Sequence, residues 1–297
     1  MRWILCGKND AAVAALEHLV ARGDEIWVIA VAGDDGADRW QRSLVGAARH
    51  HGMPVDKPRR INDPDFVARL AAYGARALVS IQYDQILKGN LFRTIGCPCL
   101  NLHFALLPRH RGVAPIAWAV LSGDAVAGVT LHHMVEDIDA GDVVAQREVA
   151  LAPDATAREL YDRLTDAAVA LFRESYPFPP ELIGRRCPQD PAVASYHRNG
   201  DFDFSQRRVD WSRPAGELGR WIRAMIFPPH QHPETTWNGR TLVIQRLAAG
   251  TGAPRPVPPG TVVAVGPDGI DVAAGDGVLR ITHLAGGAEV RVDDRLG

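Results

Sequence analysis

The sequence predicts an α/β protein that has an open, mostly parallel sheet in its first part and a smaller, barrel-like β domain at its end. Three observations lead to this prediction. Short apolar runs alternate with helical periodicities through the first half of the 297 residues, which is the pattern of a parallel sheet covered by helices. A stretch rich in proline and glycine follows. The final third carries several short β-type runs separated by Gly and Pro turns, as in a small barrel.

The strand and helix signals of the first half follow one another in a regular order. Apolar runs predict strands at residues 3–6, 25–31, 77–81, 99–102, 128–134 and 143–151. Helical spacing predicts a short helix after residue 86 and longer helices at residues 11–22, 39–51, 64–73 and 155–174. Ligands of such sheets bind beyond the carboxyl ends of the strands. The side chains just after Cys6, Ile81 and Leu102 are therefore placed for chemistry.

Changes in composition divide the chain into three parts. We predict a first domain over residues 1–175, a linker over residues 176–205 and a second domain over residues 206–297. The linker lacks sustained periodicity and is interrupted by Pro177, Pro179, Pro180, Pro188 and Pro191. In the second domain we expect a helix at residues 214–225 and strands at residues 241–247, 261–265, 270–273 and 278–284.

Composition and charge exclude several classes of protein. Hydrophobic residues make up 46% and charged residues 23%, as in globular proteins. The formal net charge of -2 provides no basic field for a nucleic-acid backbone or an anionic membrane. No apolar stretch reaches the roughly 18 residues of a membrane helix, and the apolar N-terminus is too short for a signal peptide, so we expect a cytoplasmic protein without a membrane partner. The cysteines form no CxxC pair, so we expect buried thiols and no metal.

The residues that point to chemistry lie after two of the predicted strands. The first motif is Asn101-Leu102-His103-Phe104-Ala105-Leu106-Leu107-Pro108, and the second is Ile138-Asp139-Ala140-Gly141. Residues i and i+2 of an extended strand point to the same face, so the side chains of Asn101 and His103 converge on one centre. Taken singly, an asparagine at a strand end is commonly a turn former, and a histidine there is more often structural.

Together with Gly128-Val129-Thr130-Leu131-His132, these motifs resemble the 10-formyltetrahydrofolate-dependent formyltransferase superfamily over the first domain. The resemblance implies a Rossmann-like formyltransferase fold, 10-formyltetrahydrofolate as cosubstrate, and Asn101, His103 and Asp139 as catalytic residues. The stretch Val209-Asp210-Trp211-Ser212-Arg213-Pro214-Ala215 is similar to the C-terminal domain of methionyl-tRNA formyltransferases and related sugar formyltransferases. We therefore expect an N-formyltransferase.

Formyl transfer to an amine gives these residue types defined tasks. Attack by the amine creates an anionic tetrahedral centre and makes the attacking nitrogen acidic, so the site needs an oxyanion donor and a base. We assign the base to His103, the amide donor to Asn101, and the carboxylate that orients His103 and relays protons to Asp139. Asp137 and Asp142 remain alternatives for the carboxylate, because acidic residues cluster in this loop.

Further residues are expected to hold the two substrates. In the family, the loop after the strand at residues 77–81 contacts the pterin largely through its backbone, and we place the folate at Gln85, Ile86, Leu87, Asp137 and Ile138. Arginine and lysine near the strand ends can neutralise a diphosphate. The residues expected to bind the acceptor are accordingly Lys8, Asn9, Phe104, Arg109 and Arg111.

Three acceptors share this chemistry: an amino sugar on a nucleotide carrier, the methionyl end of initiator tRNA, and a small amine such as hydroxyornithine. The acidic segment at residues 33–39 stands where methionyl-tRNA formyltransferases usually carry a lysine-rich insertion. Residues 206–297 hold 11 arginines and no lysine against 9 acidic residues, too little positive charge for extended phosphate contacts. Residues 80–87 and 103–108 look more like nucleotide-sugar N-formyltransferases. We favour a nucleotide-linked amino sugar and keep the other two acceptors open.

Other classes of protein fit less well. A dinucleotide-binding oxidoreductase would carry GxGxxG where Gly7-Lys8-Asn9-Asp10-Ala11-Ala12 stands. A non-catalytic scaffold would be free to lose the three catalytic residues, and a formyltetrahydrofolate hydrolase would normally carry a different N-terminal domain. We expect a small-molecule acceptor rather than a nucleic acid as partner, and a homodimer stays open.

Overall fold

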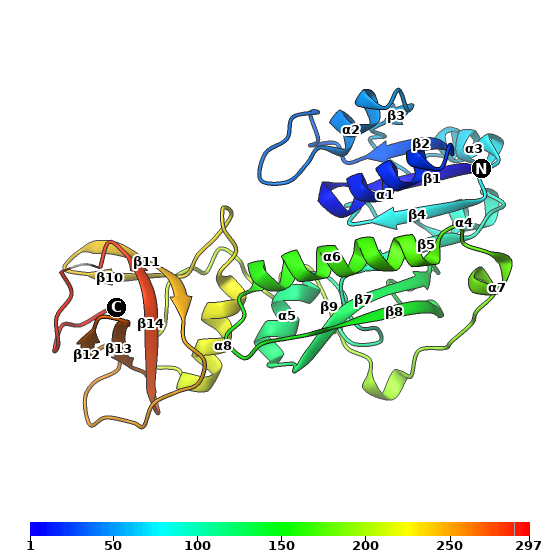
Figure 1. The fold of residues 1–297 in the computed structure, drawn as a ribbon. Helices are drawn as coiled ribbons and strands as arrows, with labels where there is room; N and C mark the ends of the chain where they lie inside the picture. The colour runs from blue at the N-terminus through cyan, green and yellow to red at the C-terminus, as the bar shows by residue number, and fades with distance from the viewer. Residues whose placement is uncertain (288) are drawn as a thin grey trace. The chain divides into compact units, whose positions relative to one another are not determined.

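The computed structural model describes residues 1–287 and 289–297, which form two compact units (Figure 1). The first unit comprises Met1–Val113, Gly128–Val149 and Arg163–His197. The second unit comprises Ala114–Ala127, Ala150–Asp162 and Arg198–Gly297. The expected domain boundaries at residues 175 and 206 stay a prediction.

A seven-stranded sheet with the order β3-β2-β1-β4-β5-β7-β8 underlies the first unit. The neighbours from β3 to β5 pair in parallel, and β5 pairs with β7 antiparallel. The predicted α/β class with an open, mostly parallel sheet is thereby confirmed. The strands are β1 (Arg2–Gly7), β2 (Glu25–Ala30), β3 (Val55–Asp56), β4 (Ala77–Ile81), β5 (Cys99–His103), β7 (Val126–His133) and β8 (Val143–Ala150).

The helices begin and end where the chain supplies local signals. In α3, the Asp63 carboxylate accepts hydrogen bonds from the backbone N–H groups of Asp65 and Phe66, and Gly74 ends the helix with a φ of 67°. The helix predicted at residues 39–51 begins later, because the Ser43 hydroxyl caps it by accepting the Gly46 N–H. The helices are α1 (Asn9–Ala21), α2 (Leu44–His50), α3 (Pro64–Tyr73), α4 (Gly89–Thr94), α5 (Pro115–Ser122), α6 (Ala157–Ser175), α7 (Pro180–Ile183) and α8 (Ala215–Met225).

Burial of apolar side chains fixes the sheet of the first unit. Helix α1 contacts β1 and β2 (Figure 1). One core cluster joins Ile4, Trp27, Leu70 and Leu78 from β1, β2, α3 and β4, and each is at most 8% exposed. Burying side chains of this size contributes about 1.5 to 3 kcal/mol each. A short parallel pair, β6 (Arg111–Gly112) with β9 (Tyr196–His197), lies outside the main sheet.

A curled antiparallel sheet of five strands, in the order β10-β11-β14-β13-β12, forms the body of the second unit. Helix α8 contacts β11 and β14 (Figure 1), and Trp211, Leu218, Ile222 and Leu279 are buried in the shared core. The small C-terminal β domain expected from the sequence is therefore present as an open, half-barrel sheet. Its strands are β10 (Glu234–Trp237), β11 (Arg240–Leu247), β12 (Val262–Gly266), β13 (Gly269–Ala273) and β14 (Val278–Ala285).

The four cysteines differ in burial. Cys6 and Cys99 are buried free thiols, Cys97 is half-buried, and Cys187 is exposed. The prediction of buried thiols is wrong for this residue. No helix in the described part of the chain is long and apolar enough to cross a membrane.

Candidate active site

The carboxyl ends of three parallel strands meet at one edge of the sheet. Gly7 at the end of β1 pairs with Ile81 of β4, and Ile81 pairs with Leu102 of β5. The Lys8 N–H donates to the Ile81 carbonyl at 3.3 Å, and the Asn9 amide donates to Gln82 Oε1 at 3.3 Å. The segments after Cys6, Ile81 and Leu102 therefore lie next to one another, as the parallel sheet predicts.

Asn101 and His132 are brought together by the antiparallel pairing of β5 and β7. The two residues are directly opposite in the strand register. Asn101 Nδ2 lies 3.2 Å from His132 Nε2 and 3.3 Å from Asp139 Oδ1. His132 Nδ1 donates to the His133 carbonyl at 2.8 Å, so in the neutral ring Nε2 is an acceptor. Both hydrogens of the Asn101 amide are thus engaged, one by His132 and one by Asp139.

The Asp139 carboxylate is the centre of the cluster. Its Oδ2 accepts the Gly112 N–H at 2.9 Å and lies 3.6 Å from His103 Nδ1, while its Oδ1 lies 3.5 Å from His132 Nε2. Burial alone would raise the pKa of Asp139, but attraction to His103 and His132 in their protonated forms, together with the Gly112 N–H, outweighs it. The pKa of this carboxyl is held well below its usual value. Asp139 is therefore ionised at neutral pH.

His103 faces Asp139 with one nitrogen and a backbone carbonyl with the other. Nε2 donates to the His110 carbonyl at 2.9 Å, and a carbonyl can only accept. In the neutral ring this leaves the lone pair on Nδ1, on the side of Asp139. The side chain is 8% exposed, and this burial lowers the pKa of His103 against the opposing attraction of Asp139. The result is an uncharged imidazole with a basic Nδ1 and a carboxylate beside it.

A side chain from the linker supports the loop that carries Asp139. Gln189 Nε2 donates to the backbone carbonyls of Asp139 and Gly141, each at 2.7 Å. Gln189 Oε1 accepts from Nε and Nη2 of Arg111 at 2.9 and 2.8 Å. Two positions in this clamp leave no room for a side chain: a Cβ on Gly141 would collide with the His133 carbonyl, and one on Gly112 with the His197 carbonyl. Arg111, expected to bind the acceptor, therefore holds Gln189.

The segments expected to bind folate lie side by side. Gly89 starts α4 against the Glu136 carboxylate so closely that a Cβ would collide with it, which places the loop before α4 beside the loop before Asp139. Ile86 is 59% exposed, whereas Leu87 is part of the buried core. Gln85 Oε1 accepts a hydrogen bond from the Ile61 N–H, and Gln85 Nε2 donates one to the Pro58 carbonyl. Because both ends of the Gln85 amide hydrogen-bond within the protein, a ligand at this loop is expected to contact its backbone.

The remaining expected residues are placed as follows. Asp137 is exposed and Ile138 is half-buried, directly before Asp139. Phe104 is buried and Arg109 is exposed. The alternative carboxylate Asp142 lies 3.9 Å from Arg186 Nε, and its backbone carbonyl accepts the His133 N–H. Of the three candidate aspartates in this loop, the structure brings Asp139 to Asn101 and His103.

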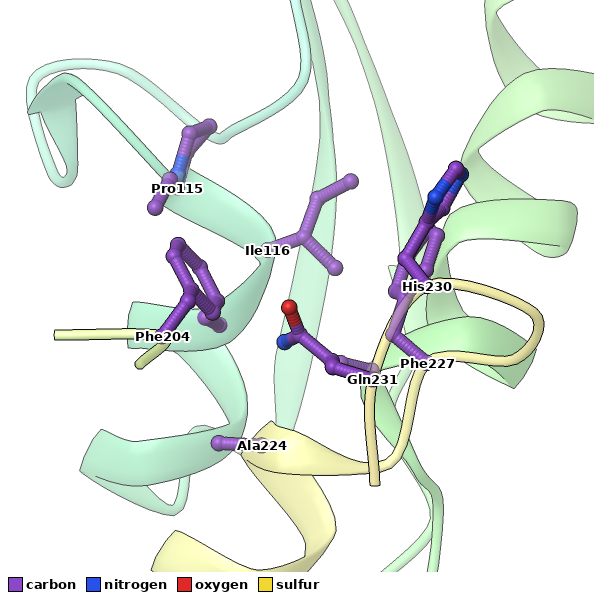
Figure 2. Close-up of a pocket in the computed structure, with 10 residues that line it drawn as sticks. Pro115, Ile116, Phe204, Ala224, Phe227, His230 and Gln231 are labelled. Carbon is purple, nitrogen blue, oxygen red and sulfur yellow. The ribbon is translucent and has the colours of Figure 1, made fainter. Parts of the chain in front are cut away.

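Each of the two units contains cavities. A cavity of about 390 Å³ in the first unit is lined by Cys99, Met134 and the Ala140–Asp142 turn. The second unit contains an apolar pocket of about 280 Å³ between α5, α8 and the loops around residues 204 and 230. Figure 2 shows Ile116, Phe204 and Gln231 directed toward one another in it. The lining of the first cavity includes Ala140, the residue after Asp139. In the second pocket, the polar lining residues are His230 and Gln231.

Sequence reasoning did not single out four residues that complete the site. His132 contacts Asn101 because two strands distant in sequence pair, while Gly112 and His110 contribute backbone groups from a loop. Gln189 reaches the site from about 50 residues further along the chain. Only His132 had a usable signal, since Thr130 and His132 alternate with apolar neighbours on one strand. Among the described residues, no group of three or more His, Cys, Asp or Glu could hold a metal ion.

The chain matches two known family patterns in series. Residues 31–175 match the family described as formyl transferase, and residues 203–296 match the formyl transferase C-terminal domain. The methionyl-tRNA formyltransferase of Myxococcus xanthus is 35% identical over 291 residues, covering 95% of this chain and 89% of that protein. The methionyl-tRNA formyltransferase of Thiobacillus denitrificans is 34% identical over 296 residues, covering 98% and 94%.

A solved structure with a similar fold contains a nucleotide-linked sugar. The N-formyltransferase of Helicobacter canadensis, crystallised with folinic acid and dTDP-3-aminofucose, superposes with a TM-score of 0.73 at 22% identity. The superposition covers 95% of this chain and 99% of the other. At this level of identity the similarity concerns the fold.

The contacts of Gln189 generate a testable prediction. Gln189→Glu keeps an acceptor for Arg111 but removes both N–H donors to the Asp139 loop, so turnover should fall at least about tenfold, the equivalent of one to two hydrogen bonds. The Michaelis constant for the formyl donor should change less than kcat, because the loop is displaced without loss of a substrate contact. Gln206→Ala, which removes an exposed glutamine, is the control. Wild-type turnover in Gln189→Glu would show that the clamp does not position Asp139.

Proposed function

The chain belongs to the formyl transferase family, and we propose that it moves a formyl group from 10-formyltetrahydrofolate to the amine of a nucleotide-linked amino sugar. The observation that carries the proposal is the cluster around Asp139, in which a buried carboxylate contacts His103, His132 and Asn101. An anionic carboxylate, a neutral imidazole and an amide are the groups that amine acylation requires.

The donor is proposed to bind beside Asp139. Three observations support this place: the loops at residues 82–88 and 134–138 are adjacent, Ile86 exposes an apolar side chain there, and the cavity of about 390 Å³ ends on the Ala140–Asp142 turn. A mixed polar and apolar wall of this kind fits a flat pterin with several hydrogen-bonding edges. 10-Formyltetrahydrofolate supplies the formyl carbon that the acceptor amine attacks.

His103 is proposed to take the proton of the attacking amine on Nδ1. The His110 carbonyl holds Nε2 in the donor state, so the lone pair lies on Nδ1, on the side of Asp139. The imidazolium that forms would lie 3.6 Å from the Asp139 carboxylate, which stabilises its charge. The same nitrogen can then return the proton to the leaving nitrogen. In this arrangement Asp139 stabilises the charged ring. The His110 carbonyl orients the His103 ring, a role that we expected Asp139 to have.

Asn101 is proposed to donate to the oxygen of the tetrahedral centre. Because its two amide hydrogens are engaged by His132 and Asp139, the developing oxyanion has to take over one of them. The hydrogen bond to the Asp139 carboxylate is charge-assisted, so the hydrogen bond to His132 is the weaker of the two. We therefore infer that His132 gives up the Asn101 hydrogen and stays as the acceptor that holds the amide between turnovers.

The charge of the chain supports a small acceptor. The acidic segment at residues 33–39 is built into the fold: Asp34 accepts from Ser43 and from the Val45 N–H, and Asp35 pairs with Arg39. These carboxylates carry negative charge where an RNA-binding loop would need the opposite. Lys8, Asn9 and Arg109 lie near the strand ends or the motif after β5, where a diphosphate could be neutralised. The dTDP-sugar in the related Helicobacter structure is compatible with this acceptor class.

A second candidate is formylation of methionyl-tRNA, and a small free amine such as hydroxyornithine is a third. The observation that favours the tRNA reading is the sequence similarity to methionyl-tRNA formyltransferases along almost the whole chain, including the C-terminal domain. Its weakness is electrostatic, because the second domain carries nearly balanced charge.

The catalytic roles predict the behaviour of three variants. His103→Ala and Asn101→Ala should each lower kcat for formyl transfer by at least about 100-fold, and Asp139→Asn should act similarly because it removes the charge that stabilises the imidazolium. Release of folate product, followed with purified enzyme and circular dichroism as a folding check, measures this. Asp142→Asn is the matched control and should retain most activity. A crippled Asp142→Asn beside an active Asp139→Asn would reverse the assignment.

The acceptor prediction uses a panel of amines. A nucleotide-linked amino sugar should react, while the free amino sugar, hydroxyornithine and methionyl-tRNA should be poor acceptors. Lys8→Ala and Arg109→Ala should each raise the Michaelis constant for the nucleotide sugar about 10- to 100-fold, the effect of one charge-assisted contact. Arg111→Ala should instead lower kcat through Gln189, and exposed Lys57→Ala is the control. Tight, salt-sensitive binding and fast formylation of initiator methionyl-tRNA would establish the second candidate in place of this one.

A further inference from the structure

The second unit contains a cavity of about 350 Å³ whose floor is one face of α8. Gly216, Gly219, Arg220 and Arg223 line it, at the spacing that places residues on one side of a helix. The loop of Gly250 and Thr251 and the segments at residues 120–125 and 151–155 form its other walls. This cavity is separate in its lining from the apolar pocket of Figure 2, which contains no arginine.

Arg223 is a buried cation without a protein partner in the described residues. The residue is 8% exposed, and neither a hydrogen bond nor an ion pair joins its guanidinium to another described residue. Burial, followed by repulsion from Arg220, lowers its pKa, and Asp154 only partly opposes this. Asp154 itself pairs with Arg246 at 3.1 Å. An unpaired buried charge is costly, so the cavity is organised for an anion that the protein does not supply.

Two glycines let both arginines lie along the helix toward its start. A Cβ on Gly219 would be 3.5 Å from Arg223 Nη1, and a Cβ on Gly216 would be 3.8 Å from Arg220 Nη1. Side chains of an α-helix lean toward its N-terminus, which is the direction these distances describe. The backbone of the first two turns is therefore bare, and the two guanidinium groups frame it.

The N-terminus of α8 adds backbone N–H donors, which attract anions as the arginines do. The helix has 11 residues, and its N-cap, Pro214, makes no side-chain cap hydrogen bond. The Ala215 N–H donates to Asp276 at 2.7 Å, but within the described chain the next two N–H groups, of Gly216 and Glu217, have no acceptor. Free N–H groups at a helix N-terminus attract anions through both hydrogen bonding and the helix dipole.

We propose that this cavity binds the phosphate group of a small phosphorylated ligand. Two guanidinium groups match the charge of a phosphate dianion, and together with the helix N–H groups and the Thr251 hydroxyl they offer more donors than one carboxylate can accept. Asp124, which also lines the cavity, reduces the positive potential without cancelling two arginines. The proposal does not depend on the formyl-transfer reaction, since all its residues belong to the second unit.

The test is binding of inorganic phosphate to the full-length protein, measured by calorimetry and by the shift in melting temperature. Phosphate should bind and raise the melting temperature of the wild type. Arg223→Gln should weaken this binding about 10- to 100-fold, while melting at or above the wild-type temperature without phosphate, because it removes an unpaired buried charge. Arg280→Gln, which loses an exposed arginine paired with Asp271, should bind phosphate as the wild type does.

Two competition experiments distinguish a small phosphorylated ligand from RNA as the source of the phosphate. A nucleoside diphosphate, with a dianionic terminal phosphate, should compete with inorganic phosphate, and a short RNA with hydroxyl ends, which has only diester groups, should not. Absence of phosphate binding to the wild type, or equal binding to Arg223→Gln, would overturn the proposal. Competition by the RNA that is lost in Arg223→Gln would overturn it in favour of an RNA-binding surface.

Discussion

The Asp139 carboxylate is the constraint on which the active-site arrangement depends. A carboxylate this far buried is stable only when charged or hydrogen-bonding partners surround it. Its hydrogen-bond donors come from separate segments, the Asn101 amide from β5 and the N–H of Gly112 from β6, and His103 and His132 of β5 and β7 lie within 3.6 Å of it. The site therefore exists only after β5 and β7 have paired. The Gln189 clamp then fixes the backbone of the loop, which allows the side chain to serve three neighbours at once.

The same arrangement explains which parts could be predicted from sequence. The alternation of apolar runs and helices sufficed for the α/β class, and the i, i+2 spacing placed Asn101 and His103 on one face, because both signals are local. The match Ile138-Asp139-Ala140-Gly141 selected one of three acidic residues, and Gly141 is required there because a Cβ would meet the His133 carbonyl. Local patterns also predicted too early a start for α2. The helix begins at Leu44, where Ser43 and Asp34 accept hydrogen bonds from its first N–H groups.

The parts that could not be predicted are non-local. His132 becomes a partner of Asn101 through strand register, and Gln189 through a linker that has no periodicity to interpret. Arg111 is a further example, because a cation near a motif suggests a ligand contact, whereas its hydrogen bonds to Gln189 depend on the fold. The same holds for the arginines of α8: as sequence they are two surface charges, whereas the fold buries Arg223 beside a bare helix start. Burial and pairing, which composition does not reveal, separate a structural cation from a binding one.

The central claim is that His103 is a neutral base whose proton resides on Nε2 and whose Nδ1 faces Asp139. Nitrogen NMR of the protein with isotope-labelled histidine, assigned by comparison with His103→Gln, measures this directly. We expect an uncharged His103 ring at neutral pH, protonated on Nε2, because burial lowers the pKa of His103 below the ordinary histidine value of about 6.5. A charged ring at neutral pH, or a neutral ring with its proton on Nδ1, would contradict the account.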